Sequence, residues 1–169
     1  MKELGEMIDV KYLQKLAGEY EKLLIQYAKQ MEDLAGESFN PRSPKQLSHI
    51  LFEVLHLGEK IRNKKTSTGM KSTKEEVLEE LKGTHPIIDI LMSYREIDKL
   101  FSTYVSVLPT LADGNGKIHA TFLQDGAATG RFSSNNPNLQ NIPVSDTEGK
   151  RIRAGFVTPK GFELVAFDY

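Results

Sequence analysis

Four side chains that carry hydrogen-bond donors lie within eleven positions of the sequence: Arg131, Asn138, Gln140 and Asn141. The minor-groove edges of all four base pairs share acceptors at purine N3 and pyrimidine O2, so such donors could bind a duplex without selecting its sequence. A simpler interpretation is that the three amides satisfy backbone groups of a loop, as Asn commonly does in turns. The residues alone favour this loop interpretation for the amides.

Asp168 is a second candidate, because it lies near the end of the β-prone run from Phe162 to Tyr169. Phosphoryl transfer with two metal ions needs carboxylates that hold the cations near the attacking and leaving oxygens. An isolated aspartate at a strand end is usually a solvated or turn residue, and one carboxylate makes a poor magnesium site. The residues alone favour the ordinary role, and the metal site is the alternative.

A basic segment from Lys60 to Lys74 contains six Lys or Arg residues and no acid. The remainder of the chain has 16 basic residues against 23 acidic ones, a net charge of -7, so contact with phosphate would be local. Such segments usually form a solvated surface, but cations interspersed with hydroxyl groups also suit a phosphate backbone. The candidate phosphate-binding residues are Lys64, Lys65, Thr68, Lys71 and Ser72.

The elements that must position these residues begin with helices. Apolar residues recur with a period of 3.6 between Val10 and Leu34, which predicts a helix that Asp9 caps and Gly36 ends. At 1.5 Å per residue this helix would be roughly 40 Å long, so it must pack along other helices. Three further helix starts are predicted at Ser43-Pro44-Lys45-Gln46, at Ser72 to Glu75 and at Pro86.

After Pro109 the sequence changes character. Asp113-Gly114-Asn115-Gly116 is a hairpin-turn signal, and residues 117–124 favour an extended strand. Residues 135–146 carry two prolines and several asparagines and are predicted to be a loop. The predicted class is therefore α+β, with a long-helix bundle at residues 1–108 followed by a small, incomplete β-containing segment at residues 109–169.

The composition excludes several kinds of protein. The chain has no cysteine, which excludes disulfides and thiolate metal sites, and its four histidines, at positions 49, 56, 85 and 119, show no ligand spacing. No run approaches the ~20 apolar residues that span a bilayer, and no leader pattern opens the sequence. We therefore expect a soluble, cytoplasmic protein.

Two linked motifs resemble those of family A DNA polymerases of the bacterial DNA polymerase I type. The stretch from Ala128 to Ser134 (ATGRFSS) precedes Pro137 to Pro143 (PNLQNIP), and the residues from Gly161 to Tyr169 resemble the start of motif A of that family. Upstream, the helix lengths, the basic tip from Thr68 to Thr73 and the Tyr94-Arg95-Glu96 stretch look like the family's thumb. The resemblance covers nearly the whole chain.

The resemblance implies a helical thumb at residues 1–108 and the N-terminal part of the palm at residues 109–169, cut within motif A. It implies that Arg131 and the three amides contact primer-template DNA. Thr129, Ser133 and Ser134 would join that surface mainly as turn formers and binders of backbone. The resemblance makes Asp168 the catalytic residue and a metal ligand, with the Tyr169 carbonyl beside it.

The complete enzyme would hold two Mg²⁺ ions and bind deoxynucleoside triphosphates, in DNA replication, DNA repair or both. The 169 residues lack the second catalytic carboxylate and the fingers, so the chain alone is expected to be inactive. Two positions depart from the family pattern: Ala127 replaces a threonine, and Phe101 replaces a lysine that faces DNA.

Three alternatives remain open at this point. The chain could be a DNA-binding module without catalysis, or one subunit of a split polymerase that acts with a separate C-terminal half. More remotely, it could be a helical interaction protein without a role on DNA. Duplex binding would separate this last possibility from the others.

Overall fold

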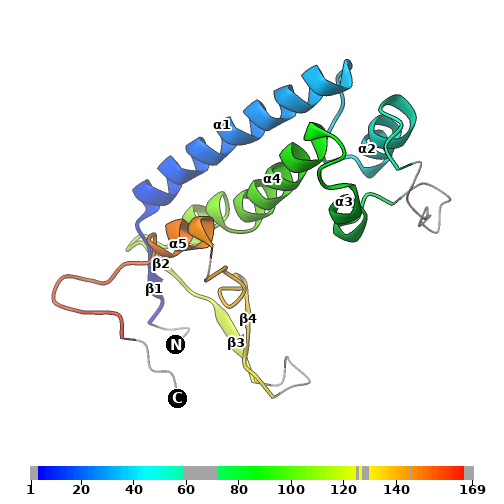
Figure 1. Ribbon diagram of the computed structural model, residues 1–169. Coiled ribbons are helices and arrows are strands. Elements are labelled where there is room, and N and C mark those ends of the chain that lie inside the picture. Colours follow the sequence, from blue (N-terminus) through cyan, green and yellow to red (C-terminus); the bar gives the residue numbers. More distant parts are fainter. Residues whose placement is uncertain (1–3, 59–71, 125, 127–129, 145, 166–169) are drawn as a thin grey trace. The chain divides into compact units, whose positions relative to one another are not determined.

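The computed structural model describes residues 4–58, 72–124, 126, 130–144 and 146–165. The chain forms two compact units: unit 1 combines Met1–Glu19 with Leu100–Tyr169, and unit 2 is Tyr20–Lys99. Long helices occur together with small two-stranded sheets (Figure 1), which confirms the predicted α+β class. The boundary expected near residue 108 between thumb and palm stays a prediction, because compact units and polymerase subdomains are different divisions of a chain.

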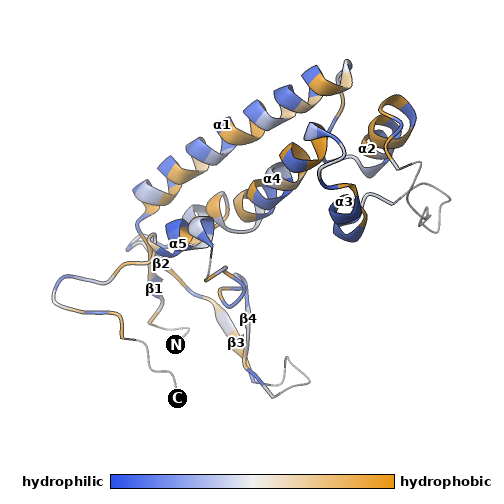
Figure 2. Cartoon of the chain, in the orientation of Figure 1, coloured by the Kyte–Doolittle hydropathy of each residue, from blue (hydrophilic) through white to orange (hydrophobic). Residues whose placement is uncertain are grey.

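Helix α1 (Val10–Ala35) forms where the apolar period predicts it, within one residue of the expected end. The Asp9 carboxylate accepts a hydrogen bond from the Tyr12 amide at 2.9 Å and so caps the first turn. At the other end Gly36 has a φ of +76°, and its amide donates to the Glu32 carbonyl at 2.9 Å. Figure 2 shows apolar and polar residues alternating along α1 as this amphipathic pattern requires.

Unit 2 also contains the short helices α2 (Pro44–His49) and α3 (Glu75–Leu81) and nearly all of α4 (Pro86–Leu100). A π-helical turn (Ile50–Val54) continues α2, and another (Phe101–Val105) continues α4 into unit 1. The predicted capping box of α2 is only half formed. Ser43 accepts from the Gln46 amide at 3.4 Å, but the Gln46 side chain accepts from the Asn40 amide at 2.6 Å.

The core of unit 2 combines Tyr20 and Met31 of α1, both 0% exposed, with aliphatic side chains on these helices. Those with less than 2% of their surface exposed are Leu47, Ile50, Leu51, Leu78, Leu81, Ile87, Ile88 and Leu91. Their burial supplies the hydrophobic free energy that holds these short helices in place.

Unit 1 contains two antiparallel pairs of strands. Strand β1 (Glu6–Met7) pairs with β2 (Lys117–Ile118), and an isolated bridge joins Ile8 to Phe156. Strand β3 (Thr121–Leu123) pairs with β4 (Ser133–Asn135), with Phe122 opposite Ser134. The single strand expected at residues 117–124 is therefore wrong, because β2 and β3 are separate and pair with different partners.

The turn at residues 113–116 forms, but the expected hairpin does not. The preceding residues Leu108–Leu111 form a 3₁₀ turn that contains Pro109. Proline has no backbone N–H that could donate a hydrogen bond to a neighbouring strand. The Asp113 carboxylate bonds with the His119 ring at 3.0 Å and accepts from the amides of Asn115 and Lys117. The His119 hydrogen bond and these two amides lower the pKa of the Asp113 carboxyl to about 2.

Helix α5 (Thr147–Arg153) is absent from the sequence-based expectations. The Asp146 carboxylate caps it by accepting from the Gly149 amide, and Ile152 is fully buried. Beyond α5, residues 162–165 form no regular structure, so the strand expected from Phe162 is not found within the described part of that run. No helix of the described chain is long and apolar enough to cross a membrane.

Candidate nucleic-acid interface

The residues with donor side chains flank strand β4 in unit 1. Arg131 lies two residues before β4, and the three amides lie in the loop that follows β4 and precedes α5, of which residues 136–144 and 146 are described. All four side chains are exposed, as the sequence interpretation requires. Within the described ranges, the Arg131 guanidinium makes no hydrogen bond or ion pair, so its donors are available to a ligand.

The first half of this loop is shaped by one serine. The Ser134 side chain is only 4% exposed; it donates to the Pro137 carbonyl at 3.0 Å and accepts from the Leu139 amide at 3.2 Å. Asn136 takes a positive φ of 50° before a cis peptide bond to Pro137. Ser134 thus acts as a former of the loop, whereas Ser133 is half-buried in β4.

Asn138 serves the loop and remains available to a ligand. Its side-chain oxygen accepts from the Gln140 amide at 3.2 Å, which is the local role that Asn commonly takes in turns. The oxygen is occupied in this way, but the NH₂ group of the same side chain is a separate pair of donors. The loop interpretation of Asn138 therefore applies to its oxygen, and a contact of its NH₂ group with DNA stays a prediction.

Helix α5 holds the second half of the loop. Arg153 donates from Nε to the Pro143 carbonyl at 3.0 Å and from a terminal nitrogen to the Ile142 carbonyl at 2.9 Å. Gly149 packs so closely that a Cβ there would lie 2.3 Å from the Pro143 oxygen. The Ile142 side chain is 4% exposed, so the backbone of the loop turns inward at this point.

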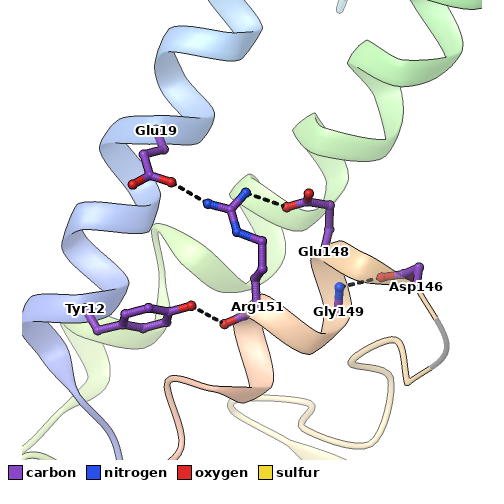
Figure 3. A network of polar contacts seen from close by, with 6 residues as sticks. All are labelled: Tyr12, Glu19, Asp146, Glu148, Gly149 and Arg151. Atoms are coloured by element: carbon purple, nitrogen blue, oxygen red, sulfur yellow. Dashed lines mark hydrogen bonds and ion pairs between the residues drawn. The ribbon is translucent and has the colours of Figure 1, made fainter.

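Helix α5 is in turn fastened to the first part of α1, which also belongs to unit 1 (Figure 3). The Arg151 guanidinium bonds with the carboxylates of Glu19 and Glu148, the latter at 3.0 Å. The Tyr12 hydroxyl donates to the Arg151 carbonyl at 2.9 Å. Sequence reasoning missed this network, although an N-cap Asp146 followed by basic residues one to two turns later is a helix signal.

Of the basic segment from Lys60 to Lys74, the structure describes only residues 72–74, which belong to unit 2. The Arg95 guanidinium donates to the Thr73 carbonyl at 2.6 Å and lies 3.5 Å from the Thr73 hydroxyl, and burial lowers the pKa of Arg95. Ser72 is 7% exposed, and its hydroxyl accepts from the Lys74 amide at 3.3 Å. Lys64, Lys65, Thr68 and Lys71 lie outside the described residues.

The expected metal ligands Asp168 and Tyr169, and also Thr129, lie outside the described residues. In the part of the chain that is described, no group of three or more His, Asp or Glu residues is placed to hold a metal ion. The described residues therefore supply a donor surface, and no metal centre is formed by them.

Comparison with known proteins gives consistent matches over nearly the whole chain. The sequence profile described as DNA polymerase family A matches residues 10–169. DNA polymerase I of Treponema pallidum is 44% identical over 169 residues, which are 100% of this chain and 16% of the relative. The thermostable DNA polymerase I of Thermus thermophilus is 44% identical over 170 residues, 100% of this chain and 20% of the relative.

The fold also matches a solved structure. It is described as the POL domain of Pol1 from M. smegmatis in complex with DNA primer-template and dNTP, and it superposes with a TM-score of 0.83 at 37% sequence identity. The match covers 95% of this chain and 28% of that one. The chain spans 16–20% of the length of the two curated relatives described above.

Proposed function

Because the chain belongs to DNA polymerase family A, we propose that it is the part of a DNA-directed DNA polymerase that binds primer-template DNA. The complete polymerase would add deoxynucleotides to the 3′ end of a primer. The observation that carries this proposal is the superposition of nearly the whole chain on a polymerase domain solved with DNA primer-template. The exposed donors on either side of β4 support it.

These donors suit a polymerase because a copying enzyme must bind every sequence equally well. Arg131 and the amides of Asn138, Gln140 and Asn141 would donate to the minor-groove acceptors that all base pairs share. A mismatch displaces those acceptors and would weaken the contacts. Ser133 and Ser134, with Thr129, would contribute by shaping the chain beside the DNA.

The basic segment would bind phosphates of the duplex. The cations Lys64, Lys65 and Lys71, with the Thr68 hydroxyl, would neutralise and hydrogen-bond the DNA backbone without reading its sequence. Ser72 is buried, so its contribution would come through the backbone at the end of the segment. Arg95, which holds the neighbouring Thr73, would then fix that end on α4.

The proposal assigns Asp168, with the Tyr169 carbonyl, to a divalent cation, Mg²⁺, which when bound stabilises the charge that develops on the transferred phosphoryl group. The described residues do not form such a site. A second carboxylate and the surface for the deoxynucleoside triphosphate would come from elsewhere in the polymerase, including a separate C-terminal half if the enzyme is split.

Substitution of Arg131 tests the proposal. In the full-length polymerase that carries this chain, Arg131→Ala should lower the rate of primer extension about 5- to 150-fold, the value of one bidentate contact of ~1–3 kcal/mol. Duplex affinity should fall much less, because the other contacts remain. Lys160→Ala, which removes an exposed cation from unit 1, is the matched control and should leave extension unchanged. Equal extension rates for Arg131→Ala and the parent on matched primers would rule out the assigned role.

A further inference from the structure

We infer that Arg153 is a positioning residue for DNA binding: it fixes the loop that presents Asn138, Gln140 and Asn141. This inference rests on the proposed function, because it assigns the loop to DNA. Arg153 would act through the backbone of the loop and would not touch the ligand itself. Neither the motifs in the sequence nor the donor side chains point to this residue.

The loop has little backbone pairing of its own. Among the described residues 136–144, the backbone forms a local turn at Gln140 and Asn141 but no helix and no strand pair. The amides of Asn136, Leu139 and Gln140 all donate to side-chain oxygens instead. Pro137 and Pro143 have no amide to offer. The conformation of the loop therefore depends on the side chains that hold it.

Two side chains hold the two halves of the loop. Ser134 bonds with Pro137 and Leu139 at the first end, and Arg153 bonds with Ile142 and Pro143 at the second. A guanidinium is a rigid planar fork, so its two hydrogen bonds fix the directions of two successive carbonyl groups together. Removal of the Arg153 fork would free the end of the loop next to Asn141.

The element that carries Arg153 is itself well anchored. Helix α5 is capped by Asp146 and buries Ile152, and the contacts of Arg151 tie it to α1 (Figure 3). Because Arg153 belongs to an anchored helix, its hydrogen bonds with the carbonyl groups of Ile142 and Pro143 hold the loop in one position relative to that helix. Pre-organised contacts bind more tightly because less conformational entropy is lost on binding.

Two substitutions distinguish positioning from direct contact with phosphate. Binding of a fluorescent primer-template to the 169-residue chain is measured by anisotropy at several salt concentrations. If Arg153 positions the loop, Arg153→Lys and Arg153→Ala should both weaken binding at least about fivefold, because lysine keeps the charge but loses the fork. The salt dependence should stay that of the parent. Lys150→Ala, an equal change of charge at an exposed position of α5, should have no effect.

Other outcomes overturn the inference. Recovery of affinity by Arg153→Lys, together with a salt slope reduced by about 0.9 in Arg153→Ala, would assign Arg153 to a phosphate contact. Unchanged affinity in both variants, measured well below their unfolding temperatures, would make Arg153 a residue of stability alone. Failure of the unsubstituted chain to bind primer-template would overturn both the proposed function and this inference. Titration of the unsubstituted chain distinguishes this outcome from the two above, in which that chain binds.

Discussion

Replacement of Gly149 by Ala should destabilise the chain, although alanine is the better helix former. Gly149 lies in the first turn of α5, where alanine would gain at most ~1 kcal/mol in helix propensity. A Cβ at this position, however, would lie 2.3 Å from the Pro143 oxygen and 2.7 Å from the Pro143 carbonyl carbon. The loop would have to move by about 1 Å to restore an ordinary contact distance.

This movement has two free-energy costs, one from overpacking and one from a weakened hydrogen bond, and both can be estimated. Overpacking of this kind costs ~1–3 kcal/mol, and displacement of the Pro143 carbonyl would weaken its hydrogen bond with Arg153, which contributes ~0.5–1.5 kcal/mol at a partly exposed site. After the gain in propensity is subtracted, a net loss of about 0.5–3.5 kcal/mol remains. In a chain of this size, that loss corresponds to a fall in Tm of roughly 1–14 °C.

The assay is thermal unfolding of the 169-residue chain followed by far-UV circular dichroism, with Gly18→Ala as the matched control. Gly18 lies inside α1, and a Cβ there would meet nothing within 4 Å. The control should therefore gain up to ~1 kcal/mol and unfold at a higher temperature. If Gly149→Ala raised Tm as Gly18→Ala does, the contact between α5 and the loop would be wrong as described.

Three further predictions concern charge and activity. The pKa of Asp113, about 2, lies below its ordinary value of 3.8. The ionised Asp113 carboxylate therefore stabilises the fold above pH ~4, and this stabilisation is lost as the pH falls toward 2. Asp113→Asn should make stability depend less on pH between these values, and an unaltered acid-unfolding profile would contradict the prediction. Duplex binding should weaken with salt by about 0.9 in slope per phosphate neutralised, and should lose part of that slope when Lys64, Lys65 and Lys71 become Ala. The chain alone should not extend a primer, a prediction refuted by extension that disappears in Asp168→Ala.

Helix α1 illustrates what local patterns can predict. Its apolar period, the Asp9 cap and the terminal Gly36 are features of neighbouring residues, and the structure has all three. The strands near residue 118 illustrate what such patterns miss. β2 pairs with β1, more than a hundred residues earlier in the chain, and a turn signal such as residues 113–116 cannot reveal a partner at that distance.

The candidate site also contains residues that local patterns identify and residues that they miss. Residue type and spacing single out the donors Arg131, Asn138, Gln140 and Asn141, and all four are exposed. Their role on DNA comes from the family resemblance and stays a prediction. Arg153 could not be found, because its role depends on carbonyl groups ten and eleven residues earlier. A backbone acceptor is present in every residue, so no side-chain pattern in the sequence marks the ones that an arginine selects.

The pairing of β1 with β2 also bears on synthesis at the ribosome. Unit 2 is one continuous stretch and can complete its core as soon as Lys99 has emerged. Glu6 must wait for Ile118, about 110 residues later, which takes on the order of 5–20 s at ~5–20 residues per second. During that interval the first strand is an unpaired edge that other chains or chaperones can bind, so translation speed between these two points should influence the yield of folded protein.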